Sequence, residues 1–165
     1  MNGRISLPGS KSITNRILLM ASLCKGQTTI NNYLKSDDTS YMIAALKTLD
    51  VIFESTENSL IMEGVNHKFP VLEAKLFLGN AGTAFRPLTA VLSMMEGNYE
   101  MSGIPRMHER PIKDLVDSLN SIGAKIKYIK DVGFPPIHIM KSNNNKNLKI
   151  EGGTKYYRWK SERKR

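Results

Sequence analysis

Apolar residues follow two spacings along most of the chain, and these spacings predict alternating helices and strands. Apolar positions three or four residues apart predict helices that bury one face, whereas short apolar runs between turn residues predict strands. The predicted helices cover residues 12–25, 37–49, 83–95 and 111–122. The predicted strands cover residues 5–7, 28–30, 51–54, 60–63, 76–78, 99–101, 125–129 and 137–140. The pattern favours a mixed α/β (α+β) fold.

The predicted elements occur in the order βαβαββ, and this order occurs twice. At an offset of 70 residues, Gly9 matches Gly79 and Arg16 matches Arg86, so single residues support the repeat as well. A repeat of this length indicates stacked supersecondary units rather than a small solenoid.

A third unit begins at residues 148–150, but no apolar helix face follows its glycines. The prediction is therefore two βαβαββ units plus an interrupted third. The predicted boundaries are a first strand at residues 1–9, one partial domain at residues 10–153 with units at about 3–66 and 75–141, and an atypical basic tail at residues 154–165.

Composition is typical of a soluble globular protein, with 41% hydrophobic and 24% charged residues. The apolar run at residues 17–21 is too short to cross a bilayer, and the first residues do not resemble a signal peptide. We therefore expect a cytoplasmic protein. Cys24 is the only cysteine, which excludes an internal disulfide and a zinc site built from thiolates. We expect this thiol to be buried.

The net charge of +9 raises the question of a nucleic-acid partner, but the distribution of charge argues against one. Residues 155–165 hold six Lys or Arg and one Glu, so the tail supplies +5. The rest of the chain carries 18 basic and 14 acidic side chains. Such a mildly basic body suits a small anionic ligand.

Both units place a glycine and a polar residue between a strand and a helix, where free backbone N–H groups favour anions. In the first unit, "LPGSKSITNR" places Lys11, Ser12 and Arg16 within about one and a half helical turns. Lysine offers a mobile charge, and arginine offers a planar fork for phosphate or carboxylate. A capped helix with solvated charges explains the same spacing, so both interpretations stay open. The P-loop pattern is absent.

The second unit carries the matching turn in "LFLGNAGTAFRPL". Asn80 and Gly82 lie at this turn, and Gly82 either permits close approach of a ligand or only eases the turn. Further along, "GIPRMHERPI" holds Arg106 and Arg110, which form either a second anion clamp or part of a surface loop.

Three other polar residues near these motifs receive simpler interpretations. His108 is interpreted as a solvated loop residue, and Asp37 or Asp38 as the cap of the second helix.

Four strings, in this order and at these intervals, resemble the 5-enolpyruvylshikimate-3-phosphate synthase family: "LPGSKSITNR", "SDDT", "LGNAGTAFRPL" and "PRMHERPIKDLVDSLNSIGAKI". The resemblance covers about residues 3–150. It implies transfer of the enolpyruvyl (carboxyvinyl) group of phosphoenolpyruvate to the 5-hydroxyl of shikimate 3-phosphate, in the shikimate pathway of aromatic amino acid biosynthesis. It also implies a fold of βαβαββ units, a monomer, and no metal or organic cofactor.

The resemblance implies roles for the first motif. Ser12 and Arg16 would hold shikimate 3-phosphate, and Lys11 would lie between the two substrates and contact both. Each substrate carries a phosphate and a carboxylate, so the site needs several cations close together.

In the later motifs, the resemblance implies that Asn80 and Gly82 let phosphoenolpyruvate approach the backbone and that Arg110 pairs with its phosphate. Arg86 and Arg106 belong to the same strings and would support the site.

The chain departs from the family in length, since family members are more than twice as long and close two domains on the substrates. The first strand normally joins the other domain, and the general acid and base are expected in the half that this chain lacks. A serine-serine-glutamine motif is replaced by residues 154–157. We therefore expect a fragment with little or no activity alone. Its tail is interpreted as a frameshift or truncation product, or as a basic segment for an anionic partner.

Two other functions are compatible with parts of the sequence. One is a related enolpyruvyl transferase that acts on a UDP-amino sugar, although the "GSKS" and "HERP" strings argue against it. The other is a nucleic-acid-binding module that uses the basic tail, although aromatic residues are few there.

Overall fold

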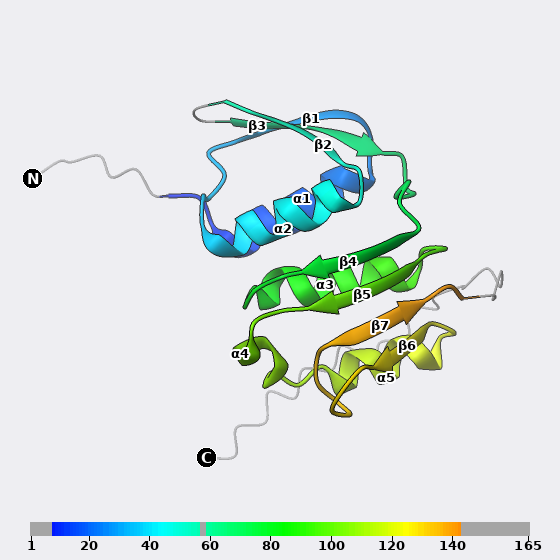
Figure 1. The fold of residues 1–165 in the computed structure, drawn as a ribbon. Helices are drawn as coiled ribbons and strands as arrows, with labels where there is room; N and C mark the ends of the chain where they lie inside the picture. Colours follow the sequence, from blue (N-terminus) through cyan, green and yellow to red (C-terminus); the bar gives the residue numbers. More distant parts are fainter. Residues whose placement is uncertain (1–7, 57–58, 143–165) are drawn as a thin grey trace, which may run out of the picture.

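The computed structural model describes residues 8–56 and 59–142 (Figure 1). The predicted strand at residues 5–7, the start of the third unit at residues 148–150 and the basic tail all lie outside the described residues. Within the described residues, helices and strands occur in nearly the predicted order. No helix among them is long and apolar enough to cross a membrane.

The first unit consists of α1 (Lys11–Leu23), β1 (Lys25–Asn31), α2 (Asp37–Thr48), β2 (Ile52–Ser55) and β3 (Ser59–Val65). Its three strands form one antiparallel sheet in the order β1-β3-β2. In the register of β1 with β3, Thr28 lies opposite Met62 and Ile30 lies opposite Leu60. Ile30, Leu60 and Met62 are buried, so the sheet turns one face to the core.

The second unit consists of β4 (Glu73–Phe77), α3 (Gly82–Ser93), β5 (Asn98–Ser102), α4 (Pro105–His108), α5 (Lys113–Ser121), β6 (Lys125–Tyr128) and β7 (Ile137–Met140). Its sheet has the order β4-β5-β7-β6. β4 and β5 are parallel because α3 forms the crossover between them, whereas β7 is antiparallel to both of its neighbours.

The two sheets confirm the predicted repeat. The order β1-β3-β2 in the first unit corresponds to β5-β7-β6 in the second, with the same antiparallel pairing. The helix of the first motif ends at Leu23 and that of the second ends at Ser93, which matches the offset of 70 residues. The counterpart of β4 would fall within residues 1–7, outside the described residues.

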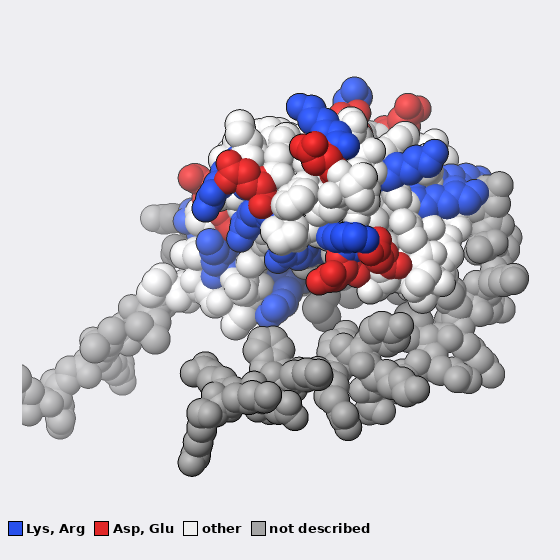
Figure 2. Space-filling model, turned by 90° about the horizontal axis from the view of Figure 1, so that it is seen from below, with Lys and Arg blue, Asp and Glu red and all other residues white. Residues whose placement is uncertain are grey.

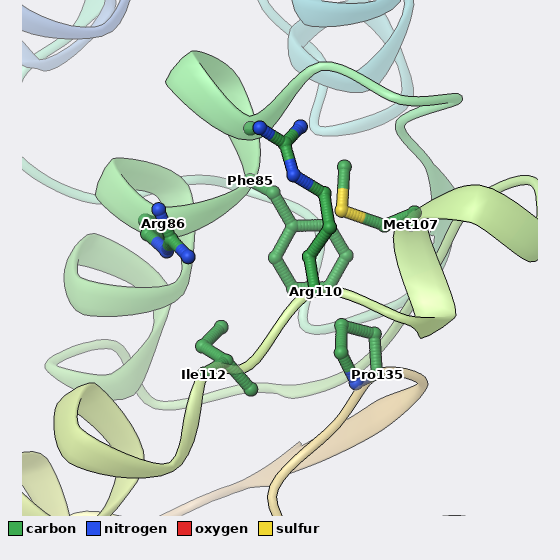
Figure 3. Close-up of a pocket in the computed structure, with 7 residues that line it drawn as sticks. Phe85, Arg86, Met107, Arg110, Ile112 and Pro135 are labelled. Carbon is green, nitrogen blue, oxygen red and sulfur yellow. The ribbon is translucent and has the colours of Figure 1, made fainter.

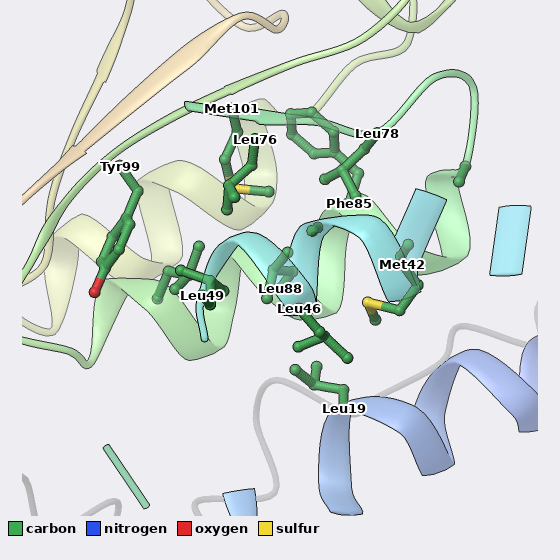
Figure 4. Packing of buried hydrophobic residues seen from close by; sticks show 14 of the residues in the cluster. Leu19, Met42, Leu46, Leu49, Leu76, Leu78, Phe85, Leu88, Tyr99 and Met101 are labelled. Atoms are coloured by element: carbon green, nitrogen blue, oxygen red, sulfur yellow. The ribbon is translucent and has the colours of Figure 1, made fainter. Parts of the chain in front are cut away.

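The core lies between the two sheets and is built mainly by helices. α1 and α2 pack side by side against the three-stranded sheet and contact α3, which lies against the four-stranded sheet (Figure 1). Leu46 of α2 and Leu88 of α3 are both fully buried at this junction (Figure 4). The two units therefore share one hydrophobic core.

The three longest helices, α1, α2 and α3, begin at the same end of the molecule. Figure 1 shows the first residues of α1, α2 and α3 at the left edge, where β4 and β5 also end, whereas α5 begins farther to the right. The strands β1, β4 and β5 run toward this edge, and α1, α2 and α3 run back from it. The fold therefore gathers several helix N-termini, with their free N–H groups, at one edge.

Four local predictions were wrong. Ser36, not Asp37 or Asp38, caps α2, because its hydroxyl accepts from the Thr39 N–H in a capping box. The thiol of Cys24 is exposed rather than buried, because α1 ends at Leu23 and Cys24 lies just beyond its buried face. Helix α4 lies in a segment interpreted as a loop, and α5 begins two residues later than predicted, at Lys113.

Tyr99 of β5 gives a pH-dependent prediction. Its buried hydroxyl donates to the Val71 carbonyl at 2.9 Å, and burial raises the pKa of Tyr99 above its ordinary value of 10.0. The folded state thus holds this proton more tightly, so the stabilisation is complete below about pH 10 and is lost as the pH rises further. We expect Tyr99→Phe to lower the free energy of unfolding at pH 7 by about 1 kcal/mol and to weaken its alkaline decline.

Urea unfolding at pH 7 and at pH 11 measures both effects. Tyr33→Phe serves as the control, because Tyr33 is half-buried and lies outside both sheets. An alkaline decline as steep in Tyr99→Phe as in the parent would contradict the prediction.

Candidate anion-binding site

The N-terminus of α1 carries the first group of predicted site residues. Ser10 is the N-cap but makes no side-chain capping bond, and the first turn contains no acidic residue. The N–H groups of this turn therefore keep their capacity for an anion. Ser12 and Arg16 lie four residues apart and so lie on the same side of the helix.

Lys11 forms an ion pair that the sequence did not reveal. Its Nζ lies 3.2 Å from an Asp38 carboxylate oxygen at the start of α2. The lysine side chain remains 48% exposed and the aspartate 22%. A partly exposed pair of this kind is weak, so an incoming anion can compete for the ammonium group. Asp38 holds Lys11 at the shared edge of α1 and α2.

The N-terminus of α3 is the second junction, and Gly79 shapes it. Gly79 has a φ of +53°, which favours glycine, and a Cβ there would lie 2.1 Å from the ring of Tyr41. Ala81, the N-cap of α3, makes no side-chain capping bond. As at α1, the first N–H groups lack a side-chain acceptor, and no acidic residue lies in the first turn.

Arg110 reaches this junction from the segment after α4. Its Nη1 donates to the Asn80 carbonyl at 3.0 Å and lies 3.4 Å from the Asn80 side-chain oxygen. Figure 3 shows the guanidinium group directed at the first turn of α3. A Cβ on Gly82 would lie 2.8 Å from Nη1, so the arginine packs directly over Gly82. The structure thus brings Asn80, Gly82 and Arg110 together.

Two further arginines lie near Arg110. Arg86 donates to the Pro111 carbonyl at 2.9 Å, and Arg106 forms an ion pair with Glu109. An open hollow of about 400 Å³ lies here, and its lining consists of Asn80, Arg86, Arg106, Glu109, Arg110 and Pro111. Since Glu109 already balances Arg106, the charge available to a ligand comes mainly from Arg86 and Arg110.

His108 does not lie in a solvated loop, so that prediction was wrong. It is the last residue of α4, is half-buried, and accepts a hydrogen bond from the Gly103 N–H at 3.4 Å. Its ring thereby holds the end of β5 close to α4.

A hydrogen bond between α1 and α3 joins the two junctions. Asn15 donates from Nδ2 to the Thr83 hydroxyl at 2.8 Å. Lys11 lies one helical turn before Asn15 on the same side of α1, and Thr83 follows Gly82. The two groups of predicted site residues are therefore neighbours, although about 70 residues separate them in the sequence.

The arrangement suits a small ligand with more than one anionic group. Flexible, planar and backbone donors converge on one edge, which is the donor set that phosphates and carboxylates require. No group of three His, Cys, Asp or Glu within residues 8–56 and 59–142 could hold a metal ion. On the face in Figure 2, basic side chains lie in separate groups with acidic side chains between them, and they do not form the continuous basic surface that nucleic acids favour.

Gly82 gives a prediction about this site. The methyl group of Gly82→Ala would displace the flexible guanidinium of Arg110 and break its bonds to Asn80. We expect the affinity for inorganic phosphate to fall about tenfold, with less than about 1 kcal/mol of change in stability, because alanine is a good helix former. NMR titration and urea unfolding measure the two quantities.

The double variant with Arg110→Ala is the control for Gly82→Ala. If the alanine acts through Arg110, the second substitution in the Gly82→Ala background weakens phosphate binding less than it does in the parent. Full additivity, or an unchanged affinity in Gly82→Ala, would contradict the explanation.

The sequence and the fold both match known proteins. The sequence model of the family EPSP synthase (3-phosphoshikimate 1-carboxyvinyltransferase) matches residues 1–154. The 3-phosphoshikimate 1-carboxyvinyltransferase of Nitrosomonas eutropha is 58% identical over 138 residues, which are 83% of this chain and 32% of that protein. The enzyme of the same name from Cupriavidus necator is 54% identical over 84% of this chain and 32% of its own length. The chain thus spans about a third of the length of the curated relatives it matches.

A solved structure of EPSP synthase from Acinetobacter baumannii superimposes on this fold with a TM-score of 0.77. The match is 26% identical in sequence and covers 84% of this chain and 32% of that one. Since the family model covers nearly the whole chain and a solved member shares its fold, the chain belongs to the EPSP synthase family.

Proposed function

We propose that this chain provides the part of a carboxyvinyl transferase that binds shikimate 3-phosphate and one side of phosphoenolpyruvate. The reaction would transfer the carboxyvinyl group to the 5-hydroxyl of shikimate 3-phosphate and release phosphate. The observation that carries the proposal is the Asn15–Thr83 hydrogen bond, which makes two anion-favouring helix N-termini neighbours. Two substrates that each bear a phosphate and a carboxylate need this kind of double site.

The residue roles follow from position and chemistry. Ser12 and Arg16, on one side of α1, hold shikimate 3-phosphate, and Lys11 lies between the substrates once an anion displaces Asp38 from it. At the α3 junction, phosphoenolpyruvate would bind beside Asn80 and Gly82, where the guanidinium of Arg110 packs over the glycine.

Arg110 pairs with the phosphate of phosphoenolpyruvate in this proposal. Its guanidinium already points to the first turn of α3, so it needs little reorganisation to bind there. Arg86 and Arg106 support the site from the same hollow.

The proposal limits what the chain does alone. It spans about a third of the length of its relatives, and we infer that the general acid and base lie in the part of the relatives that it does not match. We therefore expect weak binding and little or no turnover. No metal or organic cofactor is part of the proposed reaction. The proposed setting is the cytoplasm, which agrees with a single cysteine in 165 residues, and a monomer is expected for the full-length family.

Calorimetric or NMR titration of the full chain with shikimate 3-phosphate tests the proposal. We expect binding in the millimolar range, weakened about tenfold or more by Lys11→Ala. Lys47→Ala is the matched control, because Lys47 is exposed in the last turn of α2, at the opposite end from the site. An absence of binding, or equal binding by Lys11→Ala and the parent, would reject the half-site.

A ligand panel separates this proposal from its rivals. A UDP-amino sugar that binds more tightly than shikimate 3-phosphate would point to the related transferase. Tight binding of a single-stranded oligonucleotide with no response to shikimate 3-phosphate would point to a nucleic-acid-binding module.

A further inference from the structure

Asn15 is the residue of α1 that the proposed binding roles leave unexplained. Its side chain is fully buried, and its Nδ2 donates to the Thr83 hydroxyl across the boundary between the two units. The two partners lie 68 residues apart in the sequence. Most side-chain hydrogen bonds go to the backbone or to water, so a buried bond between side chains of two units is a specific feature.

Burying the Asn15 amide costs stability, because only one of its two polar atoms is paired, so we look for a role beyond stability. Within the described residues, the Oδ1 atom of Asn15 is buried and has no hydrogen-bond partner. An unpaired buried carbonyl oxygen destabilises a fold, and an apolar side chain of similar size would avoid that penalty. A residue that served packing alone would therefore be better replaced by leucine.

Thr14, the neighbour of Asn15 in α1, takes part in a second set of polar contacts between helices. The Thr14 hydroxyl accepts from the Leu34 N–H at 3.2 Å, and the Leu34 carbonyl accepts from the Thr39 hydroxyl at 2.7 Å. These bonds tie the first turns of α1 and α2 together through the loop between them. Asn15 follows Thr14 in α1, and its bond to Thr83 links the same turn of α1 to α3.

The Asn15–Thr83 bond lies one helical turn from Lys11 in α1 and next to Gly82 in α3. Lys11 precedes Asn15 by one turn of α1, and Thr83 follows Gly82 in α3. Any slide or rotation of α1 against α3 would change the spacing between the cations of the first junction and the backbone of the second.

We propose that Asn15 is a positioning residue that sets the spacing between the N-termini of α1 and α3. This spacing lets one site hold both anionic substrates at the correct distance from each other. This inference rests on the proposed function. Asn15 does not touch a substrate; it acts through Thr83 and through the orientation of α1. Positioning residues of this kind matter because small displacements of binding groups lower the rate and affinity of bisubstrate sites.

A ligand-free experiment tests the positioning itself. The variants are Asn15→Leu and Thr83→Val, which remove the bond, Thr83→Ser, which keeps the hydroxyl, and Ser22→Ala as the control. Ser22 is also a buried polar residue of α1, but its hydroxyl donates to the Leu19 carbonyl of the same helix.

Hydrogen exchange of the Ala84 and Phe85 amides, both bonded to the Ala81 carbonyl at the start of α3, is the readout. Asn15→Leu and Thr83→Val are expected to speed their exchange about tenfold, with the amides of β6 unchanged. Thr83→Ser and Ser22→Ala are expected to exchange like the parent. Equal acceleration throughout the chain, or none at the start of α3, would overturn the inference, whatever the chain binds.

Ligand titration then tests the consequence. Inorganic phosphate needs only one junction, so Asn15→Leu is expected to bind it within twofold of the parent. Phosphoenolpyruvate in the presence of saturating shikimate 3-phosphate needs both junctions in register, and its affinity is expected to fall about tenfold. Thr83→Ser is expected to bind both ligands like the parent.

The possible failures are distinguishable. If the parent does not bind shikimate 3-phosphate, the proposed function fails, while the exchange experiment still decides whether Asn15 positions the helices. If Asn15→Leu binds phosphate and the substrate pair like the parent, the positioning role is rejected and the proposed function stands.

Discussion

Leu88→Ala is expected to lower the free energy of unfolding by about 3–4 kcal/mol, because Leu88 is fully buried where α3 meets the other helices of the core (Figure 4). The loss combines the transfer of apolar surface with the cavity left behind. A domain of this size has about 5–15 kcal/mol of stability, so the variant loses a large fraction of it. Urea or thermal unfolding of the full chain measures the change.

Leu72→Ala is the matched control for Leu88→Ala. Leu72 lies just before β4 with 57% of its surface exposed, so the same substitution leaves no cavity. We expect it to cost less than about 1 kcal/mol. Similar losses in the two variants would mean that α3 does not form the centre of a shared core.

The repeat explains how far the sequence could predict the fold. Each unit buries one face of its strands and helices, so the spacing of apolar residues predicts where these elements lie. The matches of Gly9 with Gly79 and of Arg16 with Arg86 indicate which elements of the two units correspond. The observed sheets agree, since β1-β3-β2 and β5-β7-β6 have one topology.

Short elements and helix ends are less predictable because few residues determine them. α4 has only four residues and thus no apolar period of its own. The choice of Ser36 over Asp37 as the cap of α2 depends on the backbone conformation of residue 36, which is extended. All these residue types are good caps, so the sequence left the choice open.

The sequence likewise predicted some residues of the candidate site and missed others. The motifs identified the glycine turns and the cations beside them, and the structure brings Asn80, Gly82 and Arg110 together as the strings implied. Asp38 and the Asn15–Thr83 pair were missed, because their partners come from other helices and no local pattern marks them. Asp38 does lie within the "SDDT" string, which was the only signal that could have indicated it.

Arg110→Ala is expected to reduce the affinity of the chain for inorganic phosphate and for phosphoenolpyruvate by about 10- to 100-fold. The guanidinium supplies charged hydrogen bonds worth about 1.5–3 kcal/mol, and each 1.4 kcal/mol is a factor of about ten in affinity. Its side chain lies on the surface, so the fold keeps its stability. NMR titration with each ligand, at one fixed salt concentration, measures the loss.

Two further arginine variants decide whether the effect is specific to Arg110. Arg106→Ala removes the same charge from the same hollow, but Glu109 already balances that charge, so we expect less than a threefold loss. Arg110→Lys keeps the charge but loses the planar fork that reaches Asn80, so its affinity should fall between those of the parent and Arg110→Ala. If Arg106→Ala lost as much affinity as Arg110→Ala, net charge rather than the geometry of the α3 junction would govern binding.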